Sequence, residues 1–76
     1  MARHFLDVRR TLCPMPVIRT QDRVGGLVPG EILEVVSTDP AALVDIPTWA
    51  KINGHRIVQT YREGFDVFVV IQVGAS

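Results

Sequence analysis

The alternation of apolar and polar residues along the chain predicts four strands, separated by segments rich in proline and glycine. The expected strands span residues 4–8, 31–37, 56–62 and 65–73. The last two form a hairpin around Glu63-Gly64. Since successive side chains of a strand point to opposite faces of the sheet, every second residue lies on the same face. The core side of the last strand is expected to carry Phe65, Val67, Val69 and Ile71.

A first helix is predicted between the first two strands. It begins at Pro14 and Pro16, because proline suits the first turn of a helix, where its missing N–H has no partner. Gly25-Gly26 and then Pro29-Gly30 end the segment. Residues at helical spacing are expected to face the core, with Ile18 beside them: Val17, Thr20, Val24 and Leu27.

A second helix is predicted after residue 37, and a proline within it limits where it can begin. We expect a loose turn over residues 40–44 and a helix from about Asp45, so that Pro47 falls in its first turn. Gly54 is expected to end the helix. The inward side chains are expected to be Ile46, Trp49 and Ala50.

This order of elements predicts an α+β fold, β-α-β-α-β-β, for a single domain over residues 1–76. Right-handed crossovers make the first three strands parallel, and the hairpin makes the last one antiparallel. Both helices then cover one face of a mixed four-stranded sheet in a two-layer sandwich. An apolar row is expected on the uncovered face, which makes it a candidate homodimer interface: Phe5, Ile32, Val36, Phe68 and Val70.

Composition excludes several classes of protein. Eight basic and eight acidic residues give zero formal net charge, which argues against direct binding of nucleic acid. The single cysteine cannot form an internal disulfide, and this favours a reducing compartment. No stretch approaches the length of a membrane span, and the first residues lack the apolar core of a signal peptide. We therefore expect a cytoplasmic protein without a membrane partner.

Cys13 is the candidate functional residue, in the run Cys13-Pro14-Met15-Pro16. A lone cysteine is often only a small buried side chain. This one, however, follows a strand and precedes a helix, where α/β sheets usually place reacting groups. The positive end of the helix dipole, with Arg9 and Arg10 as a basic rim, favours its thiolate and attracts acidic partners.

The residues around Cys13 exclude several kinds of chemistry. Pro16 stands where a thioredoxin-type motif needs a second cysteine. His4 and His55 are far apart in the sequence and are expected at the surface or at strand edges. They support no metal site, no bound cofactor and no catalytic triad with Cys13.

A single exposed thiolate is suited to hold a persulfide, which it takes from a donor and gives to an attacking thiol. Such a protein is a carrier more than an enzyme with its own turnover. Two alternatives stay open. Cys13 is incidental in a non-catalytic binding or regulatory module, or it is a redox-sensing thiol that forms mixed disulfides.

Several motifs together resemble the TusA family of sulfur carriers, also called SirA-like proteins. They cover nearly the whole chain: Leu6-Asp7-Val8, Cys13-Pro14-Met15-Pro16-Val17-Ile18, Pro29-Gly30-Glu31, Thr38-Asp39-Pro40-Ala41, Asp45-Ile46-Pro47 and Gly54-His55. The resemblance implies the same sandwich fold. It also implies that Cys13 accepts sulfur from a cysteine desulfurase or a rhodanese-like donor and relays it to an acceptor protein. The pathways it implies are tRNA thiolation, molybdenum-cofactor maturation and sulfur oxidation.

Two positions depart from the family pattern. The family usually has glycine where this chain has Arg10, and commonly a basic residue where it has Asp22. Two acidic residues within the matching motifs, Asp39 and Asp45, are expected to act as turn or helix-capping carboxylates.

Overall fold

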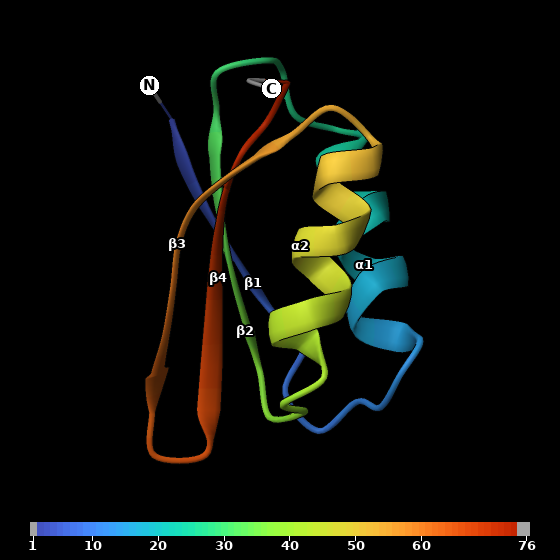
Figure 1. Cartoon of the computed structure of the whole chain (residues 1–76). Helices are drawn as coiled ribbons and strands as arrows, with labels where there is room; N and C mark the ends of the chain where they lie inside the picture. Colours follow the sequence, from blue (N-terminus) through green and yellow to red (C-terminus); the bar gives the residue numbers. More distant parts are fainter. Residues whose placement is uncertain (1, 75–76) are drawn as a thin grey trace.

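A computed structural model of the chain describes residues 2–74 (Figure 1). The elements in chain order are β1 (Arg3–Asp7), α1 (Met15–Val24), β2 (Ile32–Ser37), α2 (Ala42–Ile52), β3 (Arg56–Glu63) and β4 (Asp66–Gln72). The sheet has the strand order β1-β2-β4-β3. Strand β1 is parallel to β2, and β4 is antiparallel to β2 and β3. Both helices cover one face, so the predicted α+β two-layer sandwich is confirmed (Figure 1).

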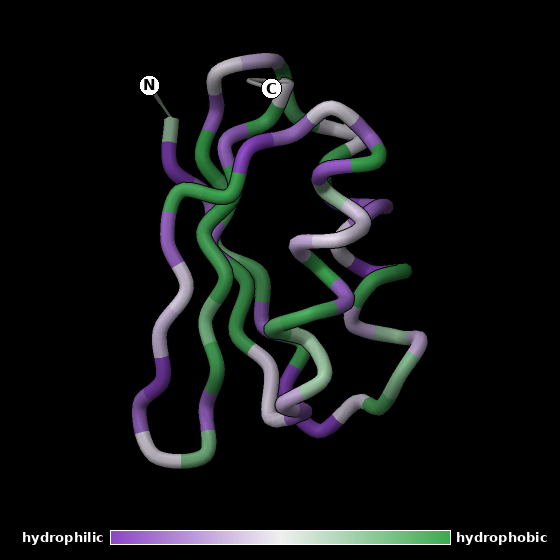
Figure 2. The backbone as a smooth tube through the Cα atoms, in the orientation of Figure 1, coloured by the Kyte–Doolittle hydropathy of each residue, from purple (hydrophilic) through white to green (hydrophobic). Residues whose placement is uncertain are grey.

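The core lies between the sheet and the two helices. Leu33 on β2, Ile46 on α2 and Ile71 on β4 have no exposed surface. Figure 2 shows hydrophobic positions concentrated along the central strands. Burying one such side chain stabilises the fold by about 1.5 to 3 kcal/mol. The inward faces predicted for β2 and α2, and for residues 67–71 of β4, are therefore confirmed.

The start of α2 differs from the prediction. The helix begins at Ala42 and not near Asp45, and Pro47 lies inside it. Asp39 accounts for the earlier start: its backbone oxygen accepts the N–H of Ala42 at 3.0 Å, and its carboxylate accepts the N–H of Ala41 at 3.0 Å. The bond that Pro47 cannot donate would have reached the first turn, so the proline is tolerated there.

Two residues expected at the core are exposed. Phe65 is 92% exposed because it lies in the turn between β3 and β4 and not on β4 itself. Ile18 is 43% exposed. The inward positions predicted for Thr20 and Val24 are confirmed, and Pro16 completes the buried side of α1. A proline in the first turn of the helix therefore also contributes to its packing.

The face of the sheet away from the helices has the predicted register, but polar side chains cover part of it. Glu34 accepts a hydrogen bond from Arg3 at 2.8 Å and another from the hydroxyl of Tyr61. The ring of Tyr61 stacks on that of Phe68, with centroids 4.5 Å apart. These side chains belong to four different strands, and together they form a polar and aromatic cover.

This cover reduces the apolar surface that the sequence predicts for the face. Val36 and Val70 are only 1% and 2% exposed, whereas Phe5 is 55% exposed. The face is therefore not the uninterrupted apolar surface that was expected. Phe5, on the edge strand β1, is its most exposed aromatic side chain.

The titration of Tyr61, the single tyrosine of the chain, reports on the hydrogen bonds of this polar and aromatic cover. Its hydrogen bond to Glu34 raises the pKa of Tyr61 from 10.0 to about 12. The contribution of this hydrogen bond to the stability of the folded protein is therefore fully present below pH 10.0 and is lost as the pH rises through about 12. We expect an absorbance titration of the folded protein to show tyrosinate only near the higher value, and Glu34→Gln to shift the midpoint back toward the lower one. A midpoint near 10.0 in the unmodified protein would contradict the network.

Candidate functional site

Cys13 lies in the loop between β1 and α1, at the end of the sheet where β1 and β2 finish (Figure 1). Its thiol is free and exposed. The N–H of Met15 donates to the carbonyl of Leu12 at 2.8 Å, so the chain turns at Cys13 directly into the helix. Pro14 is the N-cap of α1, which confirms the predicted helix start. The loop therefore presents the thiol to solvent, just before the first turn of the helix.

Two hydrogen bonds attach this loop to the turn between β2 and α2. The N–H of Arg10 donates to the Thr38 hydroxyl at 3.0 Å, and the N–H of Cys13 donates to the Asp39 carboxylate at 3.4 Å. The Asp39 N–H in turn donates to Ser37 Oγ at 3.0 Å. Asp39 thus forms a turn, as expected, and also holds the cysteine backbone, which sequence reasoning missed.

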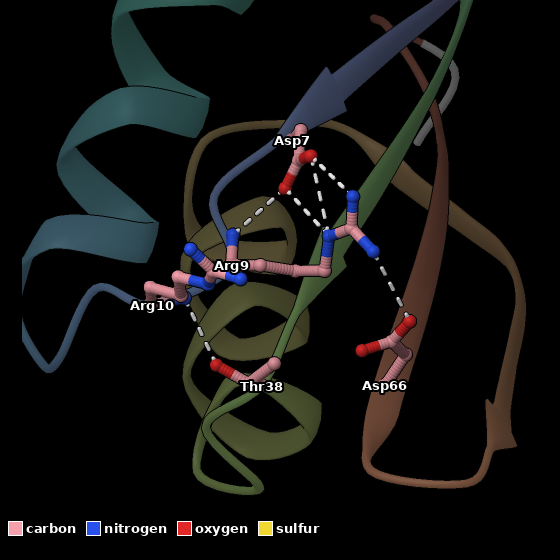
Figure 3. A network of polar contacts seen from close by, with 5 residues as sticks. All are labelled: Asp7, Arg9, Arg10, Thr38 and Asp66. Atoms are coloured by element: carbon pink, nitrogen blue, oxygen red, sulfur yellow. Dashed lines mark hydrogen bonds and ion pairs between the residues drawn. The ribbon is translucent and has the colours of Figure 1, made fainter.

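Arg9 does not belong to a basic rim around Cys13, contrary to the expectation. Its guanidinium donates to both carboxylate oxygens of Asp7, at 3.0 and 2.8 Å, and lies 3.5 Å from Asp66 (Figure 3). The side-chain hydrogen bond from Arg9 lowers the pKa of Asp7 to about 2. The two carboxylates offset its one positive charge. Of the two arginines predicted to act on the thiol, only Arg10 is without a direct ion pair among the described residues.

The two histidines are held at positions remote from the thiol. His4 Nε2 on the edge strand β1 lies 2.7 Å from Glu31 Oε2, near the start of β1 and thus at the opposite end of that strand from the Cys13 loop. His55 Nδ1 accepts the N–H of Gly74 at 2.9 Å, and its ring packs against Trp49. Neither imidazole is placed to take a proton from Cys13.

A shallow groove lies beside the site, between α1 and β1. Its lining includes the half-exposed side chains of Met15 and Ile18, and Asp22 lies along it with Arg19 and Arg23. Over residues 2–74, no cluster of His, Cys, Asp and Glu side chains is arranged to hold a metal ion. In the same part of the chain, no helix is long and apolar enough to cross a bilayer.

The fold and the site together define a small α+β sandwich with one free, exposed thiol just before its first helix. A sequence model described as sulfurtransferase TusA matches residues 4–73. The chain belongs to the TusA family.

Curated relatives cover most of the chain. The proposed sulfur carrier YrkI of Bacillus subtilis (strain 168) is 39% identical over 69 residues, which are 91% of this chain and 92% of YrkI. The sulfur carrier protein TusA of Pseudomonas paraeruginosa is 38% identical over 59 residues, 78% of this chain and 75% of that protein. YrkF of Bacillus subtilis, also a proposed sulfur carrier, is 41% identical over 59 residues, but the chain spans only 32% of its length.

A solved structure supports the fold independently. The SirA-like protein from Desulfitobacterium hafniense superimposes with a TM-score of 0.82, over 93% of this chain and 97% of that one. Because the two chains share only 19% identity, this likeness concerns the arrangement of helices and strands alone.

Proposed function

We propose that Cys13 carries sulfur as a persulfide between a donor, either a cysteine desulfurase or a rhodanese-like protein, and an acceptor protein. The observation that most supports this is the free, exposed thiol at the start of α1, in a chain that has no other cysteine. Membership of the TusA family supports the same proposal. The hydrogen bonds from the backbone of Arg10 and Cys13 to the β2–α2 turn hold the loop while these two residues stay exposed.

The proposed relay consists of two exchange steps that balance without an oxidant or a reductant. In loading, the Cys13 thiolate attacks the outer sulfur of the donor's persulfide, and the donor cysteine leaves as a thiolate. In delivery, an acceptor thiolate attacks the outer sulfur on Cys13, and the Cys13 thiolate leaves. Neither step needs an acid, a base or a cofactor from this chain. The protein acts as a carrier, and turnover belongs to its partners.

We propose that the relay takes place between proteins in the cytoplasm. Residues 1–76 form one carrier domain in the cytoplasm that contacts proteins and neither membrane nor nucleic acid directly. The acceptor belongs to tRNA thiolation, molybdenum-cofactor maturation or sulfur oxidation, the pathways that the family resemblance implies.

A homodimer through the open face of the sheet stays a prediction. Its contact would centre on Phe5, which is 55% exposed. If this face pairs with a second copy, Phe5→Glu should dissociate the dimer, because it places like charges against each other in an apolar contact. Analytical ultracentrifugation of both proteins measures this. A monomer at all concentrations would contradict the interface without affecting the relay.

The relay is tested by the mass of the intact protein after incubation with a cysteine desulfurase and cysteine. We expect a gain of one sulfur atom, located on the Cys13 peptide and removed by dithiothreitol. The reductant is essential, because a sulfinic acid adds nearly the same mass and is not reversed by thiols. An unchanged mass would contradict the proposal. A glutathione adduct alone, formed with glutathione present, would indicate a redox sensor instead.

A further inference from the structure

Arg10 adopts an unusual backbone conformation. Within residues 2–74 it is the one non-glycine residue with a positive φ, 66°. A side chain with a Cβ is disfavoured in this left-handed region, whereas glycine adopts it without strain. The hydrogen bond from its N–H to Thr38 Oγ1 at 3.0 Å helps to hold the loop in this shape. Backbone strain of this kind often occurs where a side chain is needed for function.

The side chain of Arg10 differs from that of Arg9 in its electrostatic surroundings. Both line the same polar hollow with Asp7, Thr38 and Asp66 (Figure 3). Arg9 is paired with both carboxylates, whereas no described carboxylate lies within ion-pair distance of the Arg10 guanidinium. In Figure 3 the one contact of Arg10 runs from its backbone nitrogen. The positive charge nearest to Cys13 in the sequence therefore has no direct ion pair within the described chain, although it contributes to the lowered pKa of Asp7.

Sulfur transfer requires a partner to cover this part of the loop. The partner's sulfur must touch that of Cys13, and Arg10 is three residues away, a chain length of at most about 11 Å. Removing an unpaired guanidinium from water is unfavourable unless the partner supplies an acceptor. A carboxylate is the best match, because the planar guanidinium can donate to both of its oxygens.

We infer that Arg10 binds a carboxylate beside the reactive cysteine of the sulfur-transfer partner and thereby selects acidic partners. This inference rests on the proposed function. A partner with an apolar or basic group at that place would leave the guanidinium buried and unpaired, and would be rejected. Arg9 is already paired with Asp7 and Asp66, so its guanidinium needs no carboxylate from the partner.

The test compares Arg10→Gly with the unmodified protein in loading by a cysteine desulfurase and cysteine. Glycine is chosen because it fits the observed φ, so the loop keeps its shape and the thermal midpoint should not fall. We expect the second-order rate of loading to fall about tenfold, as for the loss of one charge-assisted contact. The remaining rate should depend less on salt. Arg56→Gln, which removes the same charge from exposed Arg56 at the start of β3, is the matched control and should load at the normal rate.

Alkylation of Cys13 by neutral iodoacetamide separates partner recognition from an effect on the thiol itself. We expect Arg10→Gly to react with iodoacetamide at the rate of the unmodified protein. The inference is overturned if Arg10→Gly loads normally, if alkylation slows by the same factor as loading, or if Arg56→Gln slows loading equally. If the unmodified protein takes up no sulfur, the proposed function itself has failed, and the inference fails with it.

Discussion

Replacing Cys13 by serine should abolish sulfur loading and leave the folded protein intact. Serine is close to cysteine in size but cannot form the sulfur–sulfur bond of a persulfide. Because the Cys13 side chain is exposed, its change should alter the free energy of unfolding by no more than about 0.5 kcal/mol. The mass assay with a desulfurase measures the first effect, and thermal unfolding measures the second.

A second variant tests whether the place of the thiol matters. Gln59→Cys in the Cys13→Ser background puts an exposed cysteine on β3, away from the helix start. We expect this thiol to load far more slowly than Cys13. Equal loading would show that any exposed thiol is sufficient and would contradict the role given to the loop. A loss of several degrees in Cys13→Ser would show instead that Cys13 is a packing residue.

Replacing Ile46 by alanine should cause a large loss in the free energy of unfolding. Ile46 lies on α2 with no exposed surface and packs in the cluster formed by β2 and β4. Removing a buried isoleucine to alanine costs about 2 to 5 kcal/mol, part of it from the cavity that remains. A 76-residue domain has only about 4 to 11 kcal/mol of stability in total. The variant should therefore unfold at a much lower urea concentration.

The same helix provides the matched control. Ile52, the last residue of α2, is 77% exposed. The chemically identical change Ile52→Ala should shift the free energy of unfolding by no more than about 0.5 kcal/mol, and alanine's helix propensity favours it slightly. Equal losses in the two variants would contradict the packing of α2 on the sheet.

The register of the sheet could be predicted because the side-chain period of a strand is two. Once Leu33 and Val35 were placed inward, Val36 had to face the other side, and the structure agrees. The cover over that other face could not be predicted, because Glu34 and Tyr61 lie 27 residues apart. Nothing in the local pattern of either residue indicates the contact.

The start of α2 was misplaced because two local rules compete there. Pro47 favours the first turn of a helix, which suggests a start near Asp45. The hydrogen bonds of Asp39 to the next turn start the helix earlier, and Pro47 then costs only one bond in the first turn. The run Thr38-Asp39-Pro40 indicates an early helix start, but the sequence alone does not show whether Asp39 or Pro47 has the stronger effect on where α2 begins.

The position of Cys13 was predictable, whereas its electrostatic surroundings were only partly so. Arg9 follows Asp7 by two residues in the turn after β1, and an aspartate often accepts the backbone N–H two residues on, so their contact could have been expected. The approach of Asp66 to Arg9 depends on the hairpin and could not. The bond from Cys13 to Asp39 likewise joins loops 26 residues apart.

The most direct test of Cys13 as a sulfur carrier is whether the sulfur loaded on it can be passed on. The loaded protein is separated from its donor and treated with cyanide, which removes the outer sulfur of a persulfide as thiocyanate and leaves a thiol. We predict one thiocyanate per loaded protein and a return of the Cys13 peptide to its starting mass. A mass gain that persists without thiocyanate would mean that Cys13 is oxidised and not loaded, and would contradict the role of this chain as a sulfur carrier.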